Sequence, residues 1–107
     1  MFLIDTHTHL YLDEFKHDID ELIERAKKNN IQKFLLPNID TKTIQPLLAL
    51  SKLYPKTCYP MIGLHPCSVD HDFQNNLKRL ESKIHENNFI AIGEIGIDLH
   101  WNKTYLK

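Results

Sequence analysis

Four short apolar segments recur along the chain, at residues 2–4, 33–36, 59–62 and 89–92. Unbroken apolar runs of this length are typical of strands that are buried on both faces of a parallel sheet. The segments begin roughly thirty residues apart, which is the length of a βαβ unit. We therefore predict four parallel strands, each joined to the next by one crossover helix.

Each interval between these segments carries apolar residues spaced three and four apart, which is typical of a helix with one buried face. Asp13 is the expected N-cap of the first helix, and the Asn29-Asn30 pair is its expected end. Pro46 is compatible with the second helix only in the first turn, so this helix should begin at or after Asp40. The expected apolar faces are Phe15, Ile19, Leu22, Ile23 and Ala26, then Ile44, Leu47, Leu48 and Leu50, then Phe73, Leu77, Leu80 and Ile84.

The order βαβαβαβ indicates an α/β fold, either a (β/α)8 TIM barrel or a doubly wound sheet. A complete (β/α)8 barrel takes about 250 residues, whereas this chain has 107. We therefore predict a single partial TIM-barrel domain, residues 1–107, that contains the first four strands and three helices. The outer strands of such a half-barrel would have open edges, which invite association with another copy of the chain.

The charge of the chain excludes one way of binding nucleic acid. The formal net charge is −1, so no general positive field would attract a phosphate backbone. A phosphodiester substrate would then need a bound metal ion to supply positive charge. Cys58 and Cys67 are too far apart for a zinc-type CxxC pair. Since neither a signal peptide nor an apolar run of membrane-spanning length is recognisable, we expect a cytoplasmic protein.

Two histidines, His7 and His9, follow the first predicted strand directly. Residues i and i+2 of an extended chain point to the same face, so both imidazoles can bind one metal ion. In parallel α/β folds the carboxyl end of the sheet is the end at which ligands bind. A His-x-His pair is a weak signal when taken alone, and a purely structural role is the alternative.

The third and fourth predicted strands also end in residues that can carry chemistry. Glu94 follows the fourth strand, and a carboxylate there is costly to bury unless it binds a partner or a cation. His65 leaves the third strand just before Pro66, which fixes the direction of the chain at that point. Asn38, after the second strand, offers only a polar contact. The agreement among strand ends favours one shared site over unrelated loop residues.

Three motifs together resemble the TatD family of metal-dependent deoxyribonucleases, within the wider amidohydrolase-like group of metal enzymes. They occur in the family's order and spacing, and the resemblance covers essentially the whole chain. It implies a (β/α)8 barrel with one or two divalent metal ions (Mg, Zn or Mn) at the carboxyl ends of the strands. The motifs are Ile4-Asp5-Thr6-His7-Thr8-His9-Leu10, Gly63-Leu64-His65-Pro66 and Ile92-Gly93-Glu94-Ile95-Gly96-Ile97-Asp98.

The resemblance also implies roles for individual residues. His7 and His9 match the family's first-strand metal ligands, and Glu94 matches its fourth-strand carboxylate, which can bridge two ions. His65 matches a catalytic histidine near the substrate phosphate, and Asp5 resembles a supporting residue beside the ligands. The family's later ligands, two further histidines and an aspartate, have no counterpart in these 107 residues.

We therefore predict a metal-dependent hydrolase that cleaves phosphodiester bonds in DNA, of which this chain holds an incomplete site. The metal would polarise the phosphoryl oxygen and lower the pKa of water. One alternative is an amide or ester hydrolase of the same superfamily, because substrate specificity would come largely from loops outside these residues. The other is an inactive half-barrel that self-associates through its open edges.

Overall fold

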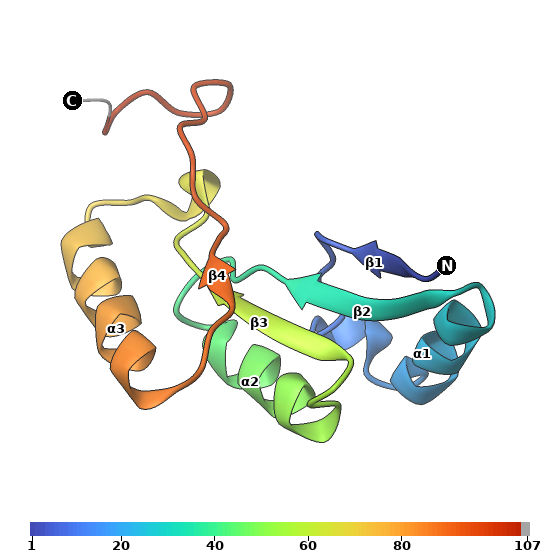
Figure 1. Ribbon diagram of the computed structural model, residues 1–107. Helices are drawn as coiled ribbons and strands as arrows, with labels where there is room; N and C mark the ends of the chain where they lie inside the picture. The colour runs from blue at the N-terminus through green and yellow to red at the C-terminus, as the bar shows by residue number, and fades with distance from the viewer. Residues whose placement is uncertain (106–107) are drawn as a thin grey trace.

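The computed structural model describes residues 1–105, in which four parallel strands form one sheet in the order β1-β2-β3-β4. The helices α1 and α2 lie on one side of the strands, and the segment after β4 runs away from them (Figure 1). The elements are β1 (Leu3–Asp5), η1 (Asp13–Phe15), α1 (Ile19–Lys28), β2 (Ile31–Leu36), α2 (Ile44–Leu53), β3 (Cys58–Ile62), η2 (Pro66–Ser68), α3 (Phe73–Glu86) and β4 (Ala91–Ile92).

The sheet is curled rather than flat. Neighbouring strands lie about 4.8 Å apart, so a flat sheet would separate β2 from β4 by about 10 Å. Yet the backbone N–H of Asn38, just after β2, donates to the carbonyl of Gly93, just after β4, at 3.0 Å. The carboxyl ends of the strands therefore curl toward one another, as they do in the wall of a barrel. The predicted α/β half-barrel with parallel βαβαβαβ order is confirmed.

Two clusters of buried side chains fill the space between the helices and the middle of the sheet. In the larger cluster, Ile23 of α1 and Leu47 of α2 pack with Phe34 and Leu36 of β2. In the smaller cluster, α2 and α3 meet the end of β3 around Ile62. Full burial of one such side chain stabilises the fold by about 1.5–3 kcal/mol, so these clusters hold β2 and β3 firmly in place.

The first helix begins later than its sequence indicates. Asp13 is not its N-cap, because residues 13–15 form the separate turn η1 and α1 begins at Ile19. Before these turns the chain places Leu10 and Tyr11 in the core, so it must change direction before a helix can start. The predicted end of this helix is confirmed, since Asn30 has a left-handed φ of 65°, which asparagine tolerates better than most residues. Pro46 lies in the first turn of α2, as predicted.

The expectation that all four strands are buried on both faces is wrong for the outer two. Leu3 and Ile4 of β1 are 50% and 47% exposed, and Ile92 of β4 is 56% exposed. Within residues 1–105, each of these strands pairs on one edge alone, β1 with β2 and β4 with β3. Leu77 and Ile84 of α3 are also exposed, so only part of the predicted apolar face of this helix is covered.

None of the helices within residues 1–105 combines the length and apolar character needed to cross a membrane. The longest, α3, has 14 residues, whereas a membrane span takes about 20. The cytoplasmic location suggested by the sequence stays a prediction.

Candidate metal centre

His7 and His9 lie in the segment that follows β1 and runs beside the end of β2, with a bend at His7. The backbone N–H of Thr8 donates to the carbonyl of Leu35 at 3.3 Å, and the imidazoles of His7 and His9 both reach the same carboxylate oxygen of Glu94. Asp5 holds the start of this segment, because its Oδ1 accepts a hydrogen bond from the backbone N–H of His7 at 3.1 Å. The two imidazole centroids are 5.2 Å apart. This contact with the backbone of His7 agrees with the predicted supporting role of Asp5.

Glu94 lies among three histidines. Its Oε2 is 3.4 Å from Nε2 of His7 and 3.4 Å from Nε2 of His9, while its Oε1 is 3.1 Å from Nε2 of His65. Oε2 is buried and has no hydrogen-bond partner among the described residues. A carboxylate oxygen that is shielded from water without a partner carries a large desolvation cost. A cation bound between the two histidines and this oxygen would remove that cost.

The donor set and its spacing fit a divalent metal ion. The ligand atoms of His7, His9 and Glu94 all lie within 4.8 Å of one another. A tetrahedral ion with bonds of about 2.0–2.2 Å holds its ligands about 3.3–3.6 Å apart, which agrees with the two 3.4 Å distances to Oε2. Two histidines and one glutamate also form some catalytic zinc sites, in which a fourth position stays open. The assignment of these residues as ligands stays a prediction, and the geometry permits it.

The charge state of His9 suits a metal ligand. Burial lowers the pKa of His9 and outweighs the nearby Glu94, which acts to raise it. The imidazole is therefore neutral near neutral pH, which is the form that binds metals. Its other ring nitrogen, Nδ1, lies 2.8 Å from the hydroxyl of Tyr11.

Tyr11 is a residue of the site that the sequence analysis missed. Its side chain belongs to the larger core cluster and is 6% exposed. The hydroxyl donates a hydrogen bond to the carbonyl of Pro37 at 2.6 Å. Burial raises the pKa of Tyr11, so the phenol keeps its proton. The sequence carried no clear signal for this role, because Tyr11 lies in the turn after His9 and its partner Pro37 is distant in sequence.

Asn38 connects the ends of three strands. Its side-chain amide donates to the carbonyl of Gly63 at 2.8 Å, and its Oδ1 accepts from the hydroxyl of Thr43 at 2.7 Å. Its backbone N–H donates to the carbonyl of Gly93 and its carbonyl accepts from the N–H of Glu94, both at 3.0 Å. The side chain is fully buried. The sequence indicated only a polar contact here, whereas Asn38 fixes the backbone from which Glu94 projects.

His65 faces Glu94 from the turn after β3. Its backbone N–H donates to the carbonyl of Ile39 at 2.8 Å, and its Nδ1 accepts from the backbone N–H of Cys67 at 3.0 Å. An accepting Nδ1 carries no proton, so the neutral ring of His65 carries its proton on Nε2. That atom points at Oε1 of Glu94. The structure thus brings His65 to the cluster, and its catalytic role stays a prediction.

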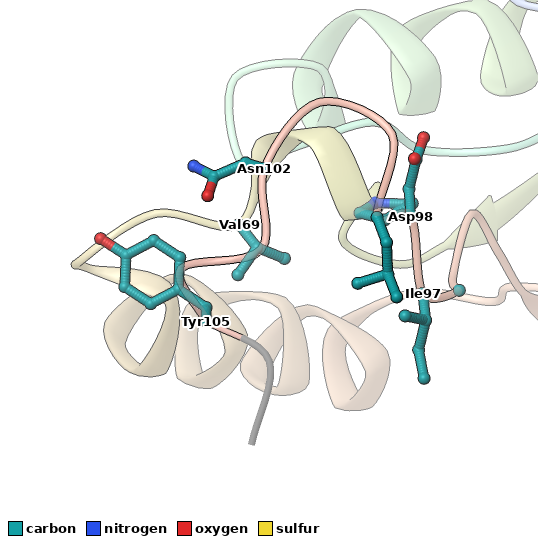
Figure 2. A pocket seen from close by; sticks show the side chains of 8 residues that line it. Val69, Ile97, Asp98, Asn102 and Tyr105 are labelled. Atoms are coloured by element: carbon teal, nitrogen blue, oxygen red, sulfur yellow. The ribbon is translucent and has the colours of Figure 1, made fainter.

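A shallow hollow lies beside His65, between η2 and the segment after β4. Figure 2 shows Val69, Ile97, Asp98, Asn102 and Tyr105 around it, with the Asp98 carboxylate directed away from the tyrosine ring. Hydrogen bonds from the backbone N–H of His100 and from the thiol of Cys67 lower the pKa of Asp98, so it is ionised near neutral pH. The hollow therefore carries a negative charge at Asp98.

Comparison with known proteins places these features in a family. The sequence model of the family described as "TatD related DNase" matches residues 4–107. Over 102 residues the chain is 31% identical to a Bacillus subtilis protein named "uncharacterized metal-dependent hydrolase YabD", covering 95% of this chain and 40% of that protein. Over 104 residues it is 28% identical to the human deoxyribonuclease TATDN3, covering 90% of this chain and 38% of that protein.

Two further comparisons agree. The chain is 26% identical over 104 residues to the 3'-5' ssDNA/RNA exonuclease TatD of Pectobacterium carotovorum, covering 94% of this chain and 38% of that protein. The crystal structure of YJJV, a TatD homolog from Escherichia coli, matches with a TM-score of 0.82 at 29% identity, covering 91% of this chain and 38% of the other. The chain thus spans about 40% of the length of the curated relatives that it matches.

Proposed function

This chain belongs to the TatD related DNase family, and we propose that it forms part of a metal-dependent hydrolase that cleaves phosphodiester bonds in DNA. We further propose that residues 1–107 form one partial barrel domain and supply three of the metal ligands. The proposal rests on one observation above all, the buried Oε2 of Glu94 that lies without a hydrogen-bond partner between His7 and His9. Relatives named as metal-dependent hydrolases support it.

His7, His9 and Glu94 would hold the divalent ion. When bound, such an ion polarises a phosphoryl oxygen and lowers the pKa of water toward neutrality. Two imidazole donors favour Zn²⁺ over Mg²⁺, because Mg²⁺ is bound mainly through oxygen ligands. With a formal net charge of −1, the chain depends on such an ion for the positive charge that meets a phosphate group.

His65 would act on the substrate rather than as a ligand. Since Nδ1 of His65 accepts from the backbone of Cys67, its Nε2 carries a proton that it can donate. A donor held in place beside the site can stabilise the negative charge that develops on a phosphoryl oxygen in the transition state. Asp5 would support the site by holding the backbone of His7.

The proposed substrate class rests on the chemistry of a metal-bound phosphodiester and on the names of related proteins. Related proteins are named as deoxyribonucleases and as an ssDNA/RNA exonuclease, which supports a nucleic-acid substrate. We propose DNA as the substrate, and parallel assays with RNA, nucleotide esters and cyclic amides of matched concentration distinguish it from the other substrates of a metal-dependent hydrolase.

The test is hydrolysis of single-stranded DNA by the purified 107-residue chain, with added Mn²⁺ or Zn²⁺ and after treatment with a chelator. We expect the affinity for Zn²⁺, and with it any metal-dependent cleavage, to fall at least about tenfold in His9→Ala, the loss seen when a metal site is disturbed. His17→Ala is the matched control, because His17 is exposed and lies before α1. Equal Zn²⁺ affinity in His9→Ala and His17→Ala would refute the proposed site. Calorimetric titration with Zn²⁺ separates loss of binding from loss of turnover.

A second proposal follows from the exposed apolar side chains of β1 and β4. We propose that the half-barrel associates with another copy through these outer strands, since unpaired apolar strand edges favour pairing. Light scattering coupled to size exclusion should then give a mass above 12.6 kDa, and Ile4→Lys should reduce it. A monomer at every concentration tested would exclude this association.

A further inference from the structure

We propose that Tyr11 is a positioning residue of the metal centre, whose hydroxyl holds His9 in the tautomer with a proton on Nδ1 and a free electron pair on Nε2. In this tautomer the nitrogen that faces Glu94 is the one able to bind a cation. The proposal deepens the proposed function, because it states how one of the three ligands is prepared for the ion.

The inference follows from counting protons along three atoms. The Tyr11 hydroxyl has one proton and lies 2.6 Å from the carbonyl oxygen of Pro37, which can only accept. The proton must therefore lie between these two oxygens, because two oxygens so close without a proton would repel each other. The phenol oxygen can then only accept from Nδ1 of His9, 2.8 Å away. Nδ1 of His9 carries the ring proton, and Nε2 of the neutral ring is left free.

Tyr11 can impose this tautomer because it is itself rigidly held. Its ring is 6% exposed and packs within the larger core cluster, so the hydroxyl has little freedom to turn away. The carbonyl that accepts its hydrogen bond belongs to Pro37, a fully buried residue just after β2. The rings of His9 and Tyr11 meet edge to face, with centroids 5.7 Å apart. The packing of the core therefore fixes the position of the Tyr11 hydroxyl, and this hydroxyl in turn fixes the orientation of the His9 ring.

His65 shows the opposite arrangement and so sharpens the assignment. Its Nδ1 accepts from a backbone N–H, which puts its proton on Nε2. The two histidines therefore present different groups to the same carboxylate, a free electron pair from His9 and an N–H from His65. His9 is prepared as a ligand and His65 as a hydrogen-bond donor, and in each case the partner of Nδ1 sets the difference.

The tautomer can be measured directly in the metal-free chain. Long-range ¹⁵N–¹H correlation spectra of the imidazole groups, assigned with His9→Ala, distinguish a protonated Nδ1 from a protonated Nε2. In the neutral form of each ring we expect the proton on Nδ1 in His9 and on Nε2 in His65. A protonated Nε2 in neutral His9 would overturn the proposal, whatever the variants show.

Tyr11→Phe removes the hydroxyl and leaves the buried ring. We expect the His9 signals to shift to a mixture of tautomers and the affinity for Zn²⁺, measured by titration, to fall about 10–100-fold. Tyr59→Phe is the matched control, since its hydroxyl also donates to a backbone carbonyl, that of Lys56 at 3.3 Å, but is exposed. The control should leave both the His9 tautomer and Zn²⁺ affinity unchanged. An unchanged His9 spectrum in Tyr11→Phe would overturn the proposal.

Failure of the positioning role and failure of the metal function give different results. If the chain binds no Zn²⁺ while His9 still has its proton on Nδ1 and loses this preference in Tyr11→Phe, the role of Tyr11 stands and the metal function fails. If Zn²⁺ binds and the affinity is the same in Tyr11→Phe, the metal function stands and the role of Tyr11 fails. A merely structural role would lower the melting temperature of Tyr11→Phe without changing the His9 tautomer.

Discussion

The middle and the outer strands of the sheet have similar apolar sequences and very different surroundings. Leu36 of β2 is fully buried and Ile62 of β3 nearly so, whereas Leu3 of β1 and Ile92 of β4 are half exposed. The middle strands pair on both edges and pack against helices, while each outer strand pairs on one edge within residues 1–105. Apolar character therefore indicates where a strand forms, and its neighbours decide whether it is buried.

The candidate ligands follow the outer strands, and the residues that orient them come from the buried interior. His7 and His9 follow β1 and Glu94 follows β4, the two strands that the fold covers least. Tyr11 and Asn38, which fix the orientation of His9 and the backbone of Glu94, are buried. The positions of these side chains thus depend on the core, although the candidate ligands themselves follow the two least buried strands.

The largest expected effect tests this difference in burial with one substitution at two places. Leu36→Ala should lower the free energy of unfolding by about 2–5 kcal/mol, because it leaves a cavity in the core. Leu3→Ala should cost less than about 1 kcal/mol, since much of that side chain already contacts water. Denaturant titration of both variants gives the two values. Similar costs at both positions would show that β1 is covered in solution, as association with another copy would require.

A buried polar group at the end of a middle strand should matter nearly as much. Asn38→Asp keeps the shape of the side chain but replaces the donor to the Gly63 carbonyl with an acceptor. We expect a loss of about 3 kcal/mol in unfolding free energy, since a buried carboxylate then faces a carbonyl oxygen, together with weaker Zn²⁺ binding. Asn75→Asp is the control, because Asn75 is exposed on α3. Equal stability of the two variants would mean that Asn38 does not hold the strand ends.

The sequence predicts the strand order and the convergence of the candidate site residues well, because both follow from periodicity and topology. Parallel strands joined by crossovers put their carboxyl ends on one side, so His9, His65 and Glu94 had to lie near one another. The motif resemblance added roles to positions that the pattern had already marked. These parts of the prediction depend on local spacing, which a single sequence displays directly.

The parts that the sequence did not predict depend on tertiary contacts. Nothing in the sequence distinguishes Tyr11 from an ordinary core residue. Its role arises because the carbonyl of Pro37, which is distant in sequence, accepts a hydrogen bond from its hydroxyl. Asn38 has four polar partners that come from three different segments. The start of α1 was placed too early because the sequence does not show that residues 10–11 enter the core first.

The close approach of β3 and β4 at the centre should be sensitive to one added methyl group. A Cβ at Gly63 would overlap the carbonyl oxygen of Glu94 and lie 2.9 Å from its nitrogen. Gly63→Ala should therefore displace Glu94, at a cost of about 1–3 kcal/mol in stability and with loss of Zn²⁺ affinity. At Gly96 the nearest atom to a Cβ would be Cγ of Pro66 at 3.9 Å, so Gly96→Ala is the control. Thermal unfolding and Zn²⁺ titration of Gly63→Ala and Gly96→Ala test this prediction. Equal stability and equal Zn²⁺ affinity of the two variants would contradict it.

The smallest effect concerns the reaction rates of the two thiols, one inside a middle strand and one in an exposed turn outside the sheet. Cys58 is buried in β3, where burial raises its pKa to about 11, and Cys67 is exposed in η2. A disulfide reagent near pH 7 should therefore label one thiol in the native chain and two after denaturation. Native labelling of both thiols at similar rates would show that the middle of the sheet opens readily, which would contradict the firm burial of the middle strands.

The carboxylate of Asp98 should slow the labelling of the exposed thiol of Cys67. Local desolvation and the hydrogen-bonded Asp98 carboxylate raise the pKa of Cys67. Asp98→Asn removes the negative charge, so the pKa should fall, the thiolate fraction near neutral pH should rise, and labelling of Cys67 should become faster. Asp70→Asn, in the exposed loop before α3, is the charge-matched control. A labelling rate equal in the two variants would mean that the Cys67–Asp98 contact does not persist in solution, because a charge so close to the sulfur must otherwise change its ionisation.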